Sequence, residues 1–291
     1  MTFGVYLRLG RISNLPTVWT NVLAGMLLAG GPLTPATLGV LIVALSMFYV
    51  GGMYLNDAFD REFDARMRPE RPIPSGQITA TAVFTIGFAL LGGGVALLVV
   101  PALGSAHAVL NWTPVASGVA LGGVITYYDV THKRDPLSPL IMGLCRVLVY
   151  LTAALAVAGT LPWPVIAGAL VLLCYLIGLT YVAKQETLAE YKNLWPLAFL
   201  AAPFVYTLPV LVRGPVGAGL WIGFLGWVLY AISFLVRRGR VNIPRAVISF
   251  IAGVSLLDGL LIAYAGYPDV ALLGVVGFAL TLAFQRWIAG T

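Results

Sequence analysis

Apolar segments long enough to cross a lipid bilayer recur along almost the whole length of this 291-residue chain. A helix needs about 20 mostly apolar residues to span roughly 30 Å of hydrocarbon. The segments here are continuously apolar, whereas strands of membrane barrels alternate apolar and polar residues. Only 10% of the residues are charged, which is too few to cover a soluble protein of this size. The chain is therefore predicted to be a helical membrane protein.

Polar, proline and glycine residues divide the apolar segments into ten predicted helices. The predicted ranges are 16–31, 35–58, 79–101, 109–128, 137–159, 162–183, 193–212, 217–236, 244–264 and 268–287. We expect an all-α, polytopic transmembrane bundle of nine or ten helices, forming a single domain over residues 1–291.

The basic residues predict the orientation of the bundle. Fifteen of the 17 Lys and Arg residues fall on one side when the N-terminus is inside, and only Arg213 falls in an outer loop. Cytoplasmic loops are enriched in Lys and Arg, so we expect this side to face the cytoplasm, in a bacterial inner membrane. The same bias accounts for the net charge of +6, and no nucleic-acid partner is expected.

An acidic motif ends the second predicted helix, where residues 56–64 read N-D-x-x-D-x-x-x-D. At about 100° per residue, Asp57, Asp60 and Asp64 share one helix face, while Glu62 points to the opposite side. Like charges at this spacing destabilise a helix, and more so near hydrocarbon. A cation should offset them. Mg²⁺ fits because it binds one or two carboxylates together with water and phosphate oxygens, which predicts a phosphorylated substrate.

Two inner loops supply groups suited to phosphate. The first follows the acidic motif, is braced by proline, and carries Arg66 and Arg71, whose guanidinium groups form bidentate phosphate contacts. The positive-inside rule alone is the alternative explanation for these arginines. The second contains Tyr128 and Lys133. Its His132 has no second histidine nearby and is predicted to be a solvated loop residue.

A second acidic pair, Glu186 and Glu190, follows the sixth predicted helix and is flanked by Lys184. The two glutamates are four residues apart and so lie on one helix face. An ordinary charged helix end neutralised by lysines is the alternative. Because the two acidic clusters end helices two and six on the same side, we expect a pseudo-repeat of four-helix halves around a central cavity.

Arg146 lies about nine residues into the fifth predicted helix. A charge within a membrane segment is a functional candidate that faces the bundle interior. The alternative is a buried structural ion pair with Asp129 or a glutamate.

These motifs resemble the UbiA superfamily of intramembrane prenyltransferases. The stretch from Asn56 to Gly76 is similar to the family's first Asp-rich motif and its following loop. The stretch from Tyr128 to Lys133 is similar to its Y-x-x-x-K element, with one residue more in the spacing. The second motif has glutamates where the family usually has aspartates, and a tenth helix would exceed the usual nine.

The resemblance implies a Mg²⁺-dependent transfer of a prenyl group from an allylic prenyl diphosphate to an aromatic or lipid-like acceptor. It implies that Asp57, Asp60 and Asp64 are catalytic. The site residues that it implies fall into two groups, metal ligands and diphosphate-binding residues. The implied metal ligands are Asn56, Asp57, Asp60, Asp64, Glu186 and Glu190. The implied diphosphate-binding residues are Asn56, Arg66, Arg71, Tyr128, Lys133, Lys184 and Arg146.

Two other functions compete with this prediction. A lipid or metabolite carrier could keep the cavity without catalysis, and release of diphosphate separates it from an enzyme. A phosphoalcohol transferase should carry a D-G-x-x-A-R element, but Asp57 and Asp60 are followed by Ala58 and Arg61.

Overall fold

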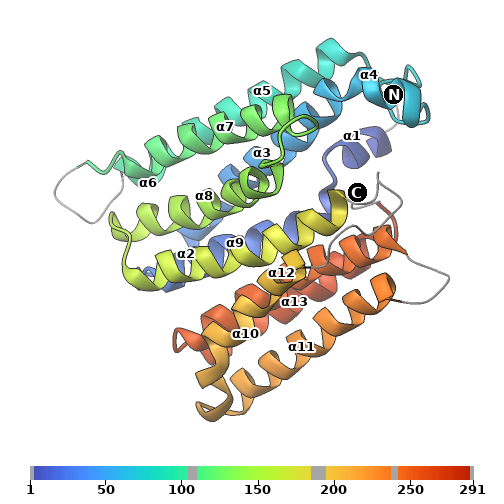
Figure 1. The fold of residues 1–291 in the computed structure, drawn as a ribbon. Helices are drawn as coiled ribbons and strands as arrows, with labels where there is room; N and C mark the ends of the chain where they lie inside the picture. The colour runs from blue at the N-terminus through green and yellow to red at the C-terminus, as the bar shows by residue number, and fades with distance from the viewer. Residues whose placement is uncertain (1–2, 104–109, 185–194, 237–241, 289–291) are drawn as a thin grey trace.

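The computed structural model describes residues 3–103, 110–184, 195–236 and 242–288. These residues form helices and no strands, and the long helices run side by side in one bundle (Figure 1). Seven of the described helices are long and apolar enough to cross a membrane. The predicted all-α membrane bundle is therefore confirmed.

Every predicted helix has a described counterpart. The α-helices are α1 Phe3–Leu9, α2 Leu15–Leu28, α3 Pro35–Phe59, α4 Arg61–Met67, α5 Ala80–Leu97, α6 Val99–Leu103, α7 Thr113–Thr131, α8 Ser138–Ala158, α9 Trp163–Lys184, α10 Ala202–Thr207, α11 Pro215–Val236, α12 Ile243–Tyr264 and α13 Pro268–Phe284. The 3₁₀-helices are η1 Ile12–Asn14, η3 Trp195–Ala201 and η4 Leu208–Val212.

Prolines explain where predicted single helices are divided. The predicted helix 79–101 is divided between α5 and α6 at Leu98, because Pro101 has no N–H to donate to the Leu97 carbonyl. The predicted helix 193–212 becomes η3, α10 and η4. Pro196, Pro203 and Pro209 recur through it, and each removes one helical hydrogen bond.

The short helix α1 was not predicted. Its Val5 and Leu9 pack with Tyr54 and Ala58 at the end of α3, and the Tyr54 hydroxyl donates a hydrogen bond of 3.1 Å to the Tyr6 carbonyl. Beyond α1 the chain turns through Arg11, which has a φ of 42° in the left-handed region. This turn places the Arg11 side chain beside the acidic motif.

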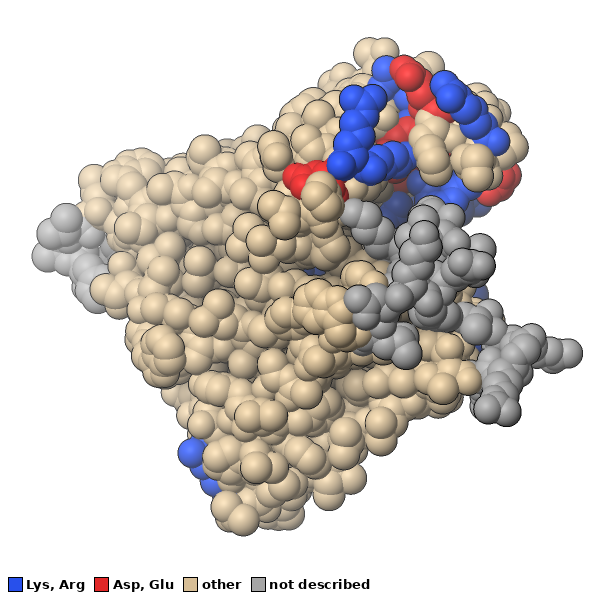
Figure 2. Space-filling model, in the orientation of Figure 1, with Lys and Arg blue, Asp and Glu red and all other residues tan. Residues whose placement is uncertain are grey.

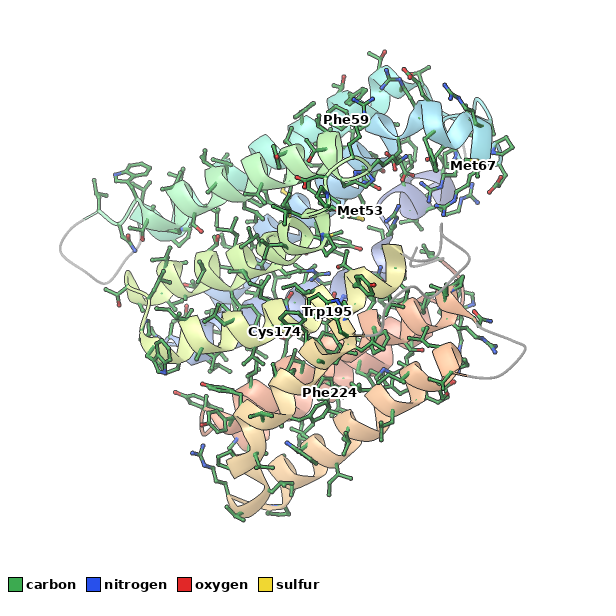
Figure 3. All side chains as sticks on the ribbon, viewed as in Figure 1. Met53, Phe59, Met67, Cys174, Trp195 and Phe224 are labelled. Carbon is green, nitrogen blue, oxygen red and sulfur yellow. The ribbon has the colours of Figure 1, made fainter. Side chains whose placement is uncertain are left out.

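Two large hydrophobic cores fill the bundle, in addition to the small cluster between α1 and the end of α3. The N-terminal core joins α2, α3, α5, α7 and α8 through residues such as Val22, Leu45, Phe48, Leu121 and Ala153. The C-terminal core joins α9, α11 and α12 with α2 and α8 through residues such as Leu172, Tyr175, Phe224 and Leu257. Phe224, labelled in Figure 3, is fully buried in the C-terminal core. Helices α2 and α8 contribute to both cores and therefore lie between them. The pseudo-repeat of four-helix halves stays a prediction.

Charged side chains gather at one end of the bundle, over α4 and the neighbouring ends of other helices (Figure 2). The rest of the visible surface carries almost no charge. This distribution matches a bundle whose sides face lipid and whose charged end faces water.

The packing of α12 against α13 depends on glycine. A Cβ atom at Gly274 would lie 2.6 Å from the Ser255 carbonyl oxygen and 2.7 Å from the Gly259 Cα. Small residues let membrane helices approach this closely.

We expect Gly274→Ala to lower the free energy of unfolding by about 1–3 kcal/mol, because the two helix backbones must separate. Thermal unfolding of the purified protein in detergent measures this change. Gly226→Ala on α11 is the matched control, because its Cβ would meet open space; it should leave the melting temperature unchanged or slightly raised. Equal melting temperatures for the two variants would contradict the packing argument.

Candidate active site

The acidic motif lies where α3 ends and α4 begins. Asp60 follows the last residue of α3 and precedes the first residue of α4. Helical hydrogen bonds continue through this junction, from Asp60 N–H to the Asn56 carbonyl at 3.0 Å and from Asp64 N–H to the Asp60 carbonyl at 2.9 Å. The three aspartates therefore keep the common face that the sequence predicted.

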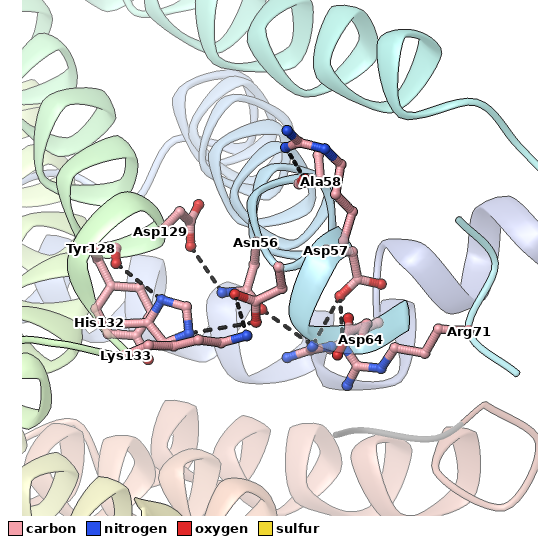
Figure 4. A network of polar contacts seen from close by, with 12 residues as sticks. Asn56, Asp57, Ala58, Asp64, Arg71, Tyr128, Asp129, His132 and Lys133 are labelled. Carbon is pink, nitrogen blue, oxygen red and sulfur yellow. Dashed lines mark hydrogen bonds and ion pairs between the residues drawn. The ribbon is translucent and has the colours of Figure 1, made fainter. Parts of the chain in front are cut away.

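Arg71 bridges two of these carboxylates. Its Nη1 lies 3.2 Å from Asp57 Oδ1 and 2.9 Å from Asp64 Oδ2 (Figure 4). Arg11 adds a third ion pair, with its Nη2 3.3 Å from the same oxygen of Asp57. The side chains of Asp57 and Asp64 are only 10% and 3% exposed, so the attraction is screened less than at an open surface. Burial raises the pKa of Asp64, and Arg71 opposes only part of that rise.

Asp60 pairs with the second inner loop. Lys133 Nζ lies 2.7 Å from Asp60 Oδ1, and His132 Nε2 lies 3.5 Å from Asp60 Oδ2 (Figure 4). Burial raises the pKa of Asp60, but the hydrogen bonds from His132 and Lys133 outweigh it, and the pKa is lowered. The Asp60 carboxylate is therefore ionised at neutral pH.

The prediction that His132 is a solvated loop residue was wrong. Its side chain is 17% exposed, its Nδ1 lies 3.2 Å from the Tyr128 carbonyl oxygen, and its ring stacks on the Tyr128 ring at 5.0 Å. The prediction rested only on the lack of a second histidine that could share a metal ion. It did not consider Asp60, which lies at the end of another helix and contacts the His132 ring.

Asp129 is a site residue that the sequence named only as a possible partner of Arg146. Its Oδ1 accepts a hydrogen bond of 3.2 Å from Asn56 Nδ2 (Figure 4). Its Oδ2 is buried and has no hydrogen-bond partner among the described residues. The clue in the sequence was an acidic residue at the inner end of a membrane helix, directly after Tyr128.

A cavity of about 290 Å³ opens beside this cluster, between the two cores. Polar groups of Arg11, Arg68, Arg71, Tyr128 and Asp129 line part of it. Apolar residues from both cores line most of the rest, among them Val18, Phe48, Ile125, Leu176 and Val254. Met53, labelled in Figure 3, also lines it. One cavity therefore combines a charged mouth with apolar walls.

The remaining predicted site residues lie in different places. Arg66 is exposed on α4 and lines a separate surface groove with Asp60 and Lys133. Arg146 lines the cavity itself. Lys184 ends α9, but its side chain lies outside the described residues, as do Glu186 and Glu190.

Arg146 makes no ion pair with a carboxylate in the described part of the chain, so the alternative of a pair with Asp129 is not seen there. Its guanidinium instead donates hydrogen bonds of 2.9 Å to Asn21 Oδ1 and 3.0 Å to Thr17 Oγ1. It also lies 5.3 Å from the centre of the Tyr49 ring.

The cluster offers oxygen ligands of the kind that Mg²⁺ prefers. Asp57, Asp60, Asp64 and Asp129 supply carboxylates and Asn56 an amide oxygen, and one buried carboxylate oxygen of Asp129 is unpaired among the described residues. No three acidic, His or Cys side chains in the described ranges converge on one point.

Comparisons with known proteins identify the family. The UbiA prenyltransferase family matches residues 17–248. The digeranylgeranylglyceryl phosphate synthase of Methanoculleus marisnigri is 32% identical over 137 residues, which is 47% of this chain and 45% of that protein. The chain thus spans less than half the length of this curated relative. The synthase of the same name from Thermococcus kodakarensis is 27% identical, over 82% of this chain and 89% of that protein.

Solved structures agree on the fold. A UbiA homologue from Archaeoglobus fulgidus bound to GPP and Mg²⁺ has a TM-score of 0.61 at 15% identity, over 91% of this chain and 99% of that chain. A digeranylgeranylglyceryl phosphate synthase structure has a TM-score of 0.58 at 20% identity, over 91% and 97%. The family match covers most of the sequence and agrees with this fold, and the chain therefore belongs to the UbiA prenyltransferase family.

Proposed function

We propose that this protein is a Mg²⁺-dependent prenyltransferase that takes its prenyl group from an allylic prenyl diphosphate. The observation that carries this proposal is a charged cluster beside a largely apolar cavity. Arg11, Arg71 and Asp129 belong to the cluster and also line the cavity. Ionic groups suit the diphosphate, and the apolar walls suit the prenyl tail. Family membership supports the same reaction.

The ion pairs at the mouth indicate how the diphosphate is held. Arg11, Arg71 and Lys133 now pair with Asp57, Asp60 and Asp64. When bound, Mg²⁺ neutralises carboxylates and phosphate oxygens and so stabilises the leaving diphosphate. The same basic side chains would hold phosphate oxygens, with which Arg forms strong charge-assisted hydrogen bonds. Asn56, Asp57, Asp60 and Asp64 are the proposed ligands, with Glu186 and Glu190 as the proposed second set.

The cavity walls suit the next step. Departure of the diphosphate leaves positive charge on the allylic carbon, and aromatic ring faces stabilise such charge. Tyr49 and Tyr128 both line the cavity. An acceptor oxygen or ring carbon then forms the new bond to the allylic carbon, and its proton passes to water or to the released diphosphate.

The relatives support one class of acceptor. Two are named for a product that carries geranylgeranyl groups on glyceryl phosphate, which supports a hydroxyl group of a glyceryl phosphate lipid as the acceptor. An aromatic acceptor, implied by the motif resemblance, is the second candidate. A carrier with the same cavity would bind prenyl diphosphate but release no diphosphate. The orientation, with this site on the cytoplasmic side of a bacterial inner membrane, also stays a prediction.

The first test removes one carboxylate. Asp60→Asn should lower Mg²⁺-dependent turnover of a radiolabelled prenyl diphosphate by about a hundredfold or more, because a charge at the leaving group is lost. Glu62→Gln is the matched control, since this acid lies two residues away and its side chain is 77% exposed. It should keep full activity. Full activity in Asp60→Asn, or no diphosphate release by the wild-type protein, would count against catalysis at this site.

The second test addresses Arg11, which the sequence did not single out. Arg11→Gln should raise the KM for prenyl diphosphate by about tenfold or more, because a charged hydrogen-bond donor is lost from the mouth. Arg8→Gln is the control, because Arg8 is exposed and contacts Gln77 instead. Steady-state kinetics in detergent measure both. Equal KM values for the two variants would remove Arg11 from the diphosphate site.

A further inference from the structure

Arg146 places a positive charge deep in the cavity. Tyr49, whose ring it faces, lies seven residues before Asn56 on α3. At 1.5 Å per residue this is roughly 10 Å along the helix axis from the carboxylate cluster. Arg71 and Lys133 contact the cluster directly, whereas Arg146 does not. It is thus available to a different anion from the one at the mouth.

The guanidinium of Arg146 has more donors than the hydrogen bonds it makes to the residues that the structure describes. It carries five N–H donors, and the two hydrogen bonds described above go to Asn21 and Thr17. The side chain lines the cavity, and none of its nitrogens is among the buried polar atoms that lack a partner in the described residues. A charge in a membrane interior is costly unless it is compensated, and a compensating group is present behind Asn21.

That group is Asp258 on α12, which is completely buried. Its carboxylate accepts hydrogen bonds from Thr20, Tyr150 and Asn21. The Nδ2 atom of Asn21 lies 3.0 Å from one carboxylate oxygen and 2.8 Å from the other. With its nitrogen held by Asp258, the Asn21 amide presents its oxygen to Arg146. Asp258 therefore both fixes the amide and offsets the positive charge.

We propose that Arg146 binds an anionic group of the acceptor, a phosphate or a carboxylate, and that Asp258 acts as a positioning residue through Asn21. The inference rests on the proposed function, because it places the acceptor in the same cavity as the prenyl donor. It separates two anion sites by depth, with the diphosphate at the mouth and the acceptor's anion at Arg146. It also moves Arg146 from the diphosphate set, where the sequence placed it, to the acceptor.

The test measures binding, which does not depend on turnover. Purified protein in nanodiscs is titrated with three acceptors: a glyceryl phosphate lipid, the same lipid without its phosphate, and a hydroxybenzoate. Arg146→Gln should raise the Kd of an anionic acceptor roughly ten- to hundredfold, because a charged hydrogen bond is lost. It should leave the Kd of the dephosphorylated lipid unchanged. A shift with the phosphate lipid identifies phosphate as the anion, and a shift with hydroxybenzoate identifies carboxylate.

The positioning role is tested in the same assay. Asp258→Asn should raise the Kd of the anionic acceptor in the wild-type background and have no further effect when combined with Arg146→Gln, because coupled residues are not additive. Asn21→Leu removes the link between Asp258 and Arg146 with a side chain of similar volume. It replaces Asp258→Asn in the test if that variant does not fold. Tyr175→Phe is the control for stability, because it removes a buried hydroxyl that donates to the Phe250 carbonyl; it should leave every Kd unchanged.

Three results would overturn the inference: no binding of either anionic acceptor, an equal loss with the dephosphorylated lipid, or additive effects in the double variant. Its failure is distinguishable from failure of the proposed function. If diphosphate is released normally but Arg146→Gln leaves the anionic acceptor's Kd unchanged, only the inference fails. If the Kd shifts as expected but no diphosphate is released, the acceptor site stands and the catalytic proposal fails.

Discussion

The need to pair charges near the membrane interior governs the arrangement of this protein. Ionised groups are costly in hydrocarbon, so they face the bundle interior and are paired there. Asp57, Asp60 and Asp64 lie at the end of α3 and the start of α4, and basic groups from three other segments pair with them. The turn after α1, the loop after α4 and the turn after α7 therefore meet at the acidic motif. The charged mouth of the cavity follows from this pairing.

Local patterns in the sequence were sufficient to predict the helices and the common face of the first acidic motif. Long continuous apolar segments predict membrane helices. Spacings of three and four residues between the aspartates predict that they share one helix face. The junction at Asp60 did not disturb that face, because helical hydrogen bonds continue through it. Proline positions could have predicted the divided helices, since each Pro removes a known hydrogen bond.

Contacts between distant segments could not be predicted in the same way. Arg11 looked like an ordinary inner arginine, and its role depends on a left-handed backbone turn and on the packing of α1 against α3. His132 was judged by its neighbours in sequence, but its partner Asp60 is 72 residues away. Asp258 lies in an apolar helix with no motif around it. In each case the role of the residue depends on a contact partner that is distant in the sequence.

The two polar clusters differ in how strongly each is fixed. At the mouth, Arg and Lys side chains pair with carboxylates, and a diphosphate that arrives with Mg²⁺ would offer new partners to both the basic and the acidic groups. At Arg146, a buried amide and a buried carboxylate hold the guanidinium from behind, and rearrangement there would strand charges away from water. A binding site that is pre-organised in this way distinguishes between ligands better than a site that rearranges around each one. The mouth is thus suited to binding and releasing diphosphate, and the deeper site to choosing which acceptor enters.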